Sequence, residues 1–229
     1  MNLADPQSLT IDVGRTTSVS ALLTKPAYVK AGFVFAHGAG AGMTHSYMQA
    51  VAAGLAARDV ATLRYQFPYM EKGSRRPDPP AVAQATVRAA VEMAARVLPG
   101  VPLIAGGKSF GGRMTSQAEA KSALPGVCGL AFFGFPLHAA GQPSKERAAH
   151  LADIKIPMLF LQGTRDKLAE LDLLEPVIAS LGAHATLHLV EGADHSFHVP
   201  ARSGRTDDGV MQEVLDAFVA WSAGVIARD

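Results

Sequence analysis

The chain has 229 residues, 48% of them hydrophobic, and a formal net charge of +1 at pH 7. A nearly neutral chain without basic blocks gives no electrostatic footprint for nucleic acid or for a membrane surface. The single cysteine, Cys128, excludes an internal disulfide and lies in an apolar run, as a small core residue does. The N-terminus has no leader pattern and no apolar run reaches membrane-spanning length, so a cytoplasmic location is expected.

The first half of the chain predicts a hairpin followed by alternating strands and helices. Residues 8–13 and 18–23 alternate apolar and polar side chains, which is typical of two antiparallel strands. The apolar run 32–36 is typical of a strand buried on both faces, and it leads into a glycine-rich loop. After this loop we expect a helix at about 45–58, a strand at 60–65, a polar loop at 66–80 and a helix at 81–98.

The second half continues the alternation. The elements expected are a strand at 102–105, a helix at 113–121, a strand at 127–133, a polar interval at 138–153, a strand at 156–161, a helix at 168–181, a strand at 185–190 and a helix at 209–226. Strands that alternate with helices imply an α/β fold, in which helices flank a mostly parallel central sheet. No repeat or linker divides the chain, so residues 1–229 are predicted to form a single domain.

A serine stands between two glycines where the fifth predicted strand ends. The segment Gly107-Lys108-Ser109-Phe110-Gly111 passes from strand to helix within a few residues, so the chain must turn sharply. Such a turn strains its central residue and needs small neighbours, and it lifts the serine hydroxyl above the sheet at a helix N-terminus. The pattern favours a nucleophile elbow; a glycine-rich turn that merely contains a serine is the simpler alternative.

Three reactive side chains follow three predicted strands in the order Ser109, Asp166 and His195. Because functional groups of a parallel sheet gather at the carboxyl ends of its strands, we expect these three to meet there. His195 suits the role of base for the Ser109 hydroxyl, and a carboxylate at Asp166 would fix the imidazole tautomer. The backbone N–H groups of Phe110 and of Ala39, in the glycine-rich loop, are the expected oxyanion donors.

Alternative assignments remain for some of these residues. Asp166 by itself could cap the N-terminus of the helix that follows it. Asp194 is a rival acid, although a residue adjacent to His195 rarely reaches the imidazole ring, and His198 in the same loop is a rival base. His37 is expected to be structural and to brace the glycine-rich loop.

Metal and nucleotide chemistry are not indicated. No cluster of His, Cys and carboxylate residues has metal-ligand spacing, so neither a metal nor another cofactor is expected. Residues 106–109 end like a phosphate-binding loop, but Pro102 occupies the position of its required upstream glycine. The expected partner is therefore a small molecule, and the sequence indicates no oligomeric state.

Together these motifs resemble those of the α/β-hydrolase superfamily over nearly the whole chain, from Phe33 to the final helix. The resemblance depends on residues 37–40 (His-Gly-Ala-Gly), 107–112 (Gly-Lys-Ser-Phe-Gly-Gly), 163–166 (Gly-Thr-Arg-Asp) and 192–197 (Gly-Ala-Asp-His-Ser-Phe). More narrowly, the chain is similar to a compact, dienelactone-hydrolase-like branch of small bacterial hydrolases. Dienelactone hydrolases use a cysteine nucleophile where this chain has Ser109, so their substrate is not carried over. The 138–153 interval is too short for the full cap domain of many members, which implies an open site that disfavours long lipids.

Side chains that follow strand ends are candidates for the walls of the substrate pocket. These candidates are Phe67, Tyr69, Phe135 and Pro136. Lys108 departs from the residues more often seen beside such a nucleophile. With Arg75, Arg76 and Arg113 close by, this cation would favour an anionic acyl substrate; otherwise it is solvated or pairs with the backbone.

The resemblance and the order of the three side chains predict a serine hydrolase that cleaves small carboxylic esters or thioesters through an acyl-Ser109 intermediate. A catalytically silent binding or scaffold protein is the alternative from another class, because a hydrolase-like domain of a chromatin-complex subunit is related to this branch. The intact set of Ser109, Asp166 and His195 argues for an enzyme. Acyl transfer to an acceptor other than water uses the same triad and is a third option.

Overall fold

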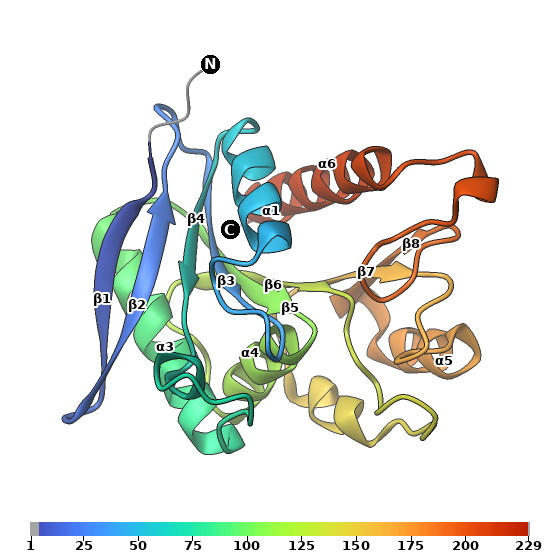
Figure 1. The fold of residues 1–229 in the computed structure, drawn as a ribbon, viewed down its shortest axis with the longest axis horizontal. Helices are drawn as coiled ribbons and strands as arrows, with labels where there is room; N and C mark the ends of the chain where they lie inside the picture. Colours follow the sequence, from blue (N-terminus) through green and yellow to red (C-terminus); the bar gives the residue numbers. More distant parts are fainter. Residues whose placement is uncertain (1–4, 229) are drawn as a thin grey trace.

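An eight-stranded, mostly parallel sheet forms the centre of the molecule (Figure 1). The computed structural model describes residues 5–228; residue 229 and residues 1–4, part of the segment predicted to lack a leader, lie outside this range. The strands are β1 (Gln7–Val13), β2 (Thr17–Thr24), β3 (Ala31–Ala36), β4 (Val60–Tyr65), β5 (Leu103–Lys108), β6 (Val127–Phe133), β7 (Met158–Gly163) and β8 (Ala185–Val190). Their spatial order is β1-β2-β4-β3-β5-β6-β7-β8, with antiparallel pairing from β1 to β4 and parallel pairing from β4 to β8.

Helices cover both faces of this sheet. They are α1 (Ser46–Ala56), α2 (Pro68–Glu71), α3 (Pro80–Val97), α4 (Phe110–Lys121), α5 (Leu171–Leu181) and α6 (Asp207–Ile226), together with the 3-10 helices η1 (Glu146–Asp153), η2 (Gly182–His184) and η3 (Ala201–Ser203). Helices α1 and α6 lie on one face, and α3, α4 and α5 lie on the other (Figure 1). This is the α/β architecture that the alternating pattern predicts.

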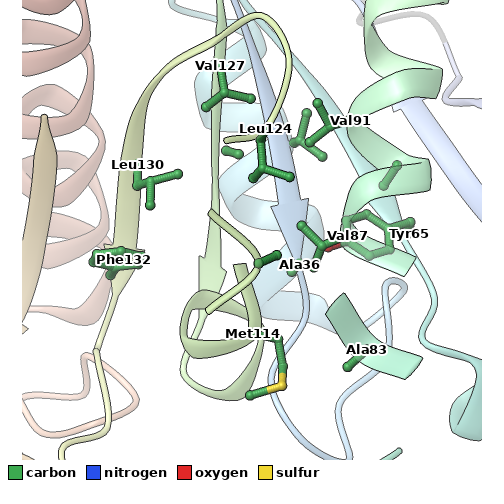
Figure 2. Close-up of a cluster of buried hydrophobic side chains, with 14 of the residues drawn as sticks. Ala36, Tyr65, Ala83, Val87, Val91, Met114, Leu124, Val127, Leu130 and Phe132 are labelled. Atoms are coloured by element: carbon green, nitrogen blue, oxygen red, sulfur yellow. The ribbon is translucent and has the colours of Figure 1, made fainter. Parts of the chain in front are cut away.

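The core consists of two layers because the central strands are buried on both faces. In β3, Phe33 and Phe35 belong to the layer beneath α1 and α6, and the Phe33 ring lies 4.8 Å from that of Phe218 in α6. Their neighbours in β3 belong to the opposite layer, where Figure 2 shows Val87 of α3 beside Tyr65 of β4. Each such side chain contributes about 1.5–3 kcal/mol when it is fully buried, so the continuous apolar runs read from the sequence are what fix the strands.

Helix α6 corrects one expectation. By length and composition alone this helix could cross a membrane, since it has 20 residues and an 18-residue window with a mean hydropathy of 1.2. An apolar segment of membrane-spanning length is therefore present among the described residues. In the structure its stripe of Val210, Val214 and Phe218 is buried against the sheet, as in a helix that covers a core.

Two local differences from the predicted elements matter for the site. Helix α4 begins at Phe110, directly after Ser109, and not at 113, because the glycines at 111 and 112 are helical despite their low propensity. The predicted loop 66–80 contains the short helix α2, which starts with Pro68 in its first turn. Between β6 and β7 the only helix is η1, so no full cap domain is present in this interval.

Candidate active site

Ser109 occupies the turn between β5 and α4 in a strained conformation. Its φ and ψ are 49° and −113°, and among residues 5–228 only Asp59 and Phe197 are other non-glycine residues with positive φ. Such a conformation costs of the order of 1–3 kcal/mol and is retained where the surrounding structure enforces it. The Ser109 N–H donates to the Phe133 carbonyl at 3.2 Å, which ties the turn to β6.

The glycines on either side of Ser109 are required by contact with backbone. A Cβ atom on Gly107 would lie 2.5 Å from the Ala36 carbonyl oxygen, and one on Gly111 would lie 2.6 Å from the carbonyl oxygens of Ala36 and His37. Real Cβ atoms do not approach this closely, and backbone atoms of a central strand cannot move aside. The pattern read from the sequence as an elbow is therefore a close crossing of α4 over the end of β3.

Ser109, His195 and Asp166 form one continuous hydrogen-bonded chain. His195 Nε2 lies 2.8 Å from Ser109 Oγ, and His195 Nδ1 lies 2.6 Å from Asp166 Oδ2. Because an ionised carboxylate only accepts, the Nδ1–H donates to Asp166 and leaves Nε2 free to accept the Ser109 hydroxyl proton. The Asp166 side chain is fully buried, whereas 23% of the His195 side chain is exposed.

The two carboxylate oxygens of Asp166 accept hydrogen bonds from three N–H groups. Besides His195, Gln162 Nε2 donates to Oδ2, and the Leu168 N–H donates to Oδ1 at 2.8 Å. Asp166 thus closes a turn with the Leu168 N–H and contacts the imidazole, but it does not cap the following helix, because α5 begins at Leu171 with Glu170 as its N-cap. Gln162 was missed in the sequence, although a buried polar residue directly before the end of a strand is a usable signal; its Oε1 accepts the Phe135 N–H at 2.9 Å.

The loop after β8 distinguishes His195 from its rivals. Asp194 Oδ1 accepts the N–H groups of Ser196 and His198, at 2.8 and 3.0 Å, so this carboxylate closes the turn. The His198 ring pairs with Asp207 at 2.8 Å, and its side chain is 62% exposed. Neither rival hydrogen-bonds to Ser109 or to the His195 ring.

Lys108 adopts the backbone-pairing arrangement. Its Nζ donates to the His195 carbonyl oxygen, and it lies 6.0 and 5.3 Å from the ring centroids of Tyr47 and Phe197, which stack on each other. Burial lowers the pKa of the Lys108 ammonium to about 8. The three arginines expected near Lys108 are absent from the lining of the pocket above Ser109; Arg76 lines a different pocket and Arg113 lies 6.0 Å from the Phe110 ring centroid.

The glycine-rich loop lies directly against the elbow. A Cβ on Gly38 would be 3.9 Å from Ser109 Cβ. His37 braces the loop as expected: its Nδ1–H donates to the Gly38 carbonyl at 2.7 Å, and its Nε2 accepts the Phe67 N–H at 3.1 Å. Burial lowers the pKa of His37 to about 4, so the ring is neutral at pH 7.

A pocket of about 440 Å³ opens above Ser109. It is lined by Gly38, Ala39, Ala41, His45, Tyr47, Met48, Lys108, Ser109, Leu168, His195 and Ser196. Both His195 and the expected oxyanion donor Ala39 belong to this lining, and Phe110 is the first residue of α4. Because α4 begins there, the Phe110 N–H is one of the helix N–H groups without an intrahelical acceptor.

The predicted pocket walls are wrong. Phe67 and Phe135 are completely buried, Phe67 against the His37 and Tyr65 rings and Phe135 against other aromatic rings of the core. Pro136 is buried as well and does not line the pocket. Tyr69 is 3% exposed, and its hydroxyl accepts the Gly40 N–H at 3.1 Å, so it supports the glycine-rich loop from behind. The three aromatic side chains follow strand ends, but they are buried because large aromatic rings gain more from the core than from a pocket wall.

Among residues 5–228, no group of three or more His, Cys, Asp and Glu side chains is placed to hold a metal ion.

Solved structures with the same fold cover almost all of this chain. An α/β serine hydrolase homologue from Coxiella burnetii is 17% identical over 96% of this chain and 99% of its own, with a TM-score of 0.75. A dienelactone hydrolase from Anabaena variabilis is 19% identical (95% and 97% covered, TM-score 0.76), and a serine hydrolase without a lid from Xanthomonas campestris is 21% identical (95% and 97%, TM-score 0.71). At these identities the likeness establishes the fold.

The family comparison is more specific. Residues 29–223 match the family described as the alpha/beta hydrolase domain, a span that runs from before β3 to within α6 and contains every residue of the hydrogen-bonded chain. The resemblance inferred from the four motifs is confirmed, and the chain belongs to the α/β-hydrolase family.

Proposed function

We propose that this protein is a serine hydrolase that cleaves small carboxylic esters or thioesters through an acyl-Ser109 intermediate. The observation that carries the proposal is the unbroken chain from Ser109 Oγ through His195 to Asp166, with Ser109 and His195 both lining the same pocket. A structural role for these polar groups would not need a strained serine at the pocket floor. A structural role would also not need a histidine, His195, placed to accept the proton of the serine hydroxyl.

In the first half of the reaction, Ser109 Oγ attacks the acyl carbon while its proton passes to His195 Nε2. Asp166 holds the Nδ1–H and stabilises the imidazolium that forms. The carbonyl oxygen becomes an oxyanion, for which the N–H groups of Phe110 and Ala39 are the proposed donors; each such donor typically contributes a factor of about 10²–10³ in turnover. His195 then protonates the leaving alcohol or thiol, and the acyl group stays on Ser109.

In the second half, water enters beside His195, loses a proton to Nε2 and attacks the acyl carbon. Ser109 leaves with that proton, and a carboxylic acid is released. The size of the pocket, about 440 Å³, and the absence of a cap domain between β6 and β7 support small substrates that approach from solvent.

The test is labelling with a fluorophosphonate probe, read by intact mass and peptide mapping. The wild type is expected to take up one adduct at Ser109, and both Ser109→Ala and His195→Ala are expected to lose it. Hydrolysis of short-chain 4-nitrophenyl esters should disappear in the same two variants. A folded wild type that takes up no adduct would overturn the proposal and favour a silent binding protein; an adduct without net hydrolysis would favour acyl transfer.

A further inference from the structure

A second pocket adjoins the one above Ser109. It encloses about 580 Å³ and is lined by Arg165, Lys167, Leu168, Asp194, His195, His198 and Pro200. His195 and Leu168 line both pockets, so the two spaces lie beside the same two residues.

The charges of this second pocket are unevenly compensated. The side chains of Arg165 and Lys167 are exposed, and neither forms an ion pair or a hydrogen bond within the described residues 5–228. The only carboxylate in the lining, Asp194, already accepts two backbone N–H groups. His198 is paired with Asp207. Two cations thus remain without partners beside the site of chemistry, in a chain whose net charge is only +1.

The position of the second pocket beside His195 relates it to the leaving group of the substrate. His195 has to protonate the leaving group, so the leaving alcohol or thiol must lie within hydrogen-bond reach of Nε2. The acyl group is instead held at Ser109, between the elbow and the glycine-rich loop. Because His195 also lines the neighbouring pocket, a leaving group that extended past His195 and Leu168 would reach Arg165 and Lys167.

We propose that Arg165 and Lys167 form a leaving-group subsite that selects esters or thioesters whose alcohol or thiol part carries a carboxylate or a phosphate. The inference rests on the proposed hydrolase function and adds a substrate class to it. Arginine offers a planar fork that matches both kinds of anion, and lysine adds a mobile charge. The same two cations would attract anionic substrates from solution, an effect that salt screens.

The experiment compares three acetate esters: 4-acetoxybenzoate, 4-acetoxyphenyl phosphate and neutral methyl 4-acetoxybenzoate. For the wild type at low salt, we expect kcat/KM for at least one anionic ester to exceed that of the neutral ester by about fivefold to tenfold. The better of the two anionic esters then distinguishes carboxylate from phosphate. In the double variant Arg165→Gln/Lys167→Gln this ratio is expected to fall to within twofold of one, and 0.5 M NaCl should lower it in the wild type.

A matched control removes one arginine and one lysine elsewhere. Lys72 and Arg75 are exposed residues of the 66–80 segment, so Lys72→Gln/Arg75→Gln changes the net charge equally and should keep the wild-type ratio. An equal fall in both double variants, or a wild-type ratio near one, would overturn the subsite.

A binding measurement separates this outcome from failure of the proposed function. The three esters are titrated into Ser109→Ala, with and without the Arg165→Gln/Lys167→Gln changes, and the dissociation constants are compared. Tighter binding of an anionic ester that depends on the two cations would support the subsite even if the wild type hydrolysed none of the esters. Equal binding of all three would overturn it.

Discussion

The two sides of Ser109 are built in different ways. On one side, the glycine-rich loop is held by the buried neutral ring of His37, by the hydroxyl of the largely buried Tyr69 and by the backbone of α4, which crosses at Gly111. On the other side, the loop that carries His195 is partly exposed, and the Lys108 ammonium donates to its backbone. The glycine-rich side is held by several hydrogen bonds and close contacts from buried groups, and the His195 side by a hydrogen bond from the Lys108 ammonium.

This difference matches what each side has to do. Donors for an oxyanion work best when they are already in place, because any reorganisation during the reaction reduces the stabilisation they give. The imidazole, in contrast, has to accept a proton from Ser109 and deliver it to the leaving group. Substitutions on the glycine-rich side should therefore reduce stability, whereas substitutions on the His195 side should reduce turnover in a folded protein.

The largest stability effect is expected at the crossing of α4 over β3. Gly111→Ala places a Cβ 2.6 Å from two carbonyl oxygens, so either the helix or the strand must shift. We expect a loss of about 3 kcal/mol in the free energy of unfolding, measured by urea denaturation, together with loss of probe labelling at Ser109. Gly224→Ala in α6 is the control, because no atom lies within 4 Å of the new Cβ; it should be neutral or stabilise by up to about 1 kcal/mol. A Gly111→Ala protein as stable as wild type would show that this side is not closely packed.

The buried ring of His37 predicts how the glycine-rich side responds to acid. Burial lowers its pKa to about 4 in the native state, whereas an unfolded histidine titrates near 6.5. Between these values the unfolded chain binds a proton that the native protein does not, so stability falls as the pH decreases. For His37 this amounts to about 2 kcal/mol between pH 7 and pH 5.

Urea denaturation at the two pH values measures this effect. In His37→Asn, which keeps a hydrogen-bonding side chain but cannot titrate, the fall in stability from pH 7 to pH 5 should be smaller by about that amount. The comparison uses the pH-dependent difference, so a constant loss caused by the substitution cancels. His184→Asn, at an exposed position, should keep the wild-type difference; an unchanged difference in His37→Asn would mean that His37 is not a neutral buried ring.

The sequence predicts the sheet, its flanking helices and the meeting of Ser109, Asp166 and His195 because these depend on local patterns. Apolar runs determine where the strands lie. The parallel topology then brings the carboxyl ends of the strands to one edge of the sheet, independent of the conformation of the loops. The elbow could be predicted for the same reason. Its two glycines stand within five residues, and each is needed because another backbone segment lies too close for a Cβ atom.

The pocket walls could not be predicted in this way. Phe67 and Phe135 follow strand ends in the sequence, but whether a loop side chain turns towards solvent or core depends on packing partners from distant segments. Gln162 was overlooked for a related reason: Asp166 is four residues away in the sequence, but Phe135 becomes a neighbour of Gln162 only through the pairing of β6 with β7. Contacts between loops require the three-dimensional arrangement.

The smallest effect is expected on the His195 side, at Lys108. Its ammonium joins the residue before the nucleophile to the backbone of His195, so Lys108 is a positioning residue for the imidazole. Lys108→Met keeps an unbranched side chain of similar length but removes the donor and the charge beside the Tyr47 and Phe197 rings. We expect kcat for the neutral ester methyl 4-acetoxybenzoate to fall about tenfold, equivalent to about 1.4 kcal/mol, with KM changed by less than twofold and with the urea midpoint close to that of the wild type.

The anionic and neutral esters show which of two roles Lys108 has. If it positions His195, Lys108→Met slows all esters by the same factor, because every substrate uses the same imidazole. If it binds an anion on the acyl side, Lys108→Met raises KM only for esters of dicarboxylic acids, such as mono-4-nitrophenyl succinate, and leaves 4-nitrophenyl butyrate unaffected. Lys121→Met, at an exposed position at the end of α4, is the control for the loss of one charge. The pairing of Nζ with the His195 carbonyl favours the uniform loss, because this hydrogen bond holds the ammonium against the backbone of the residue that carries the imidazole.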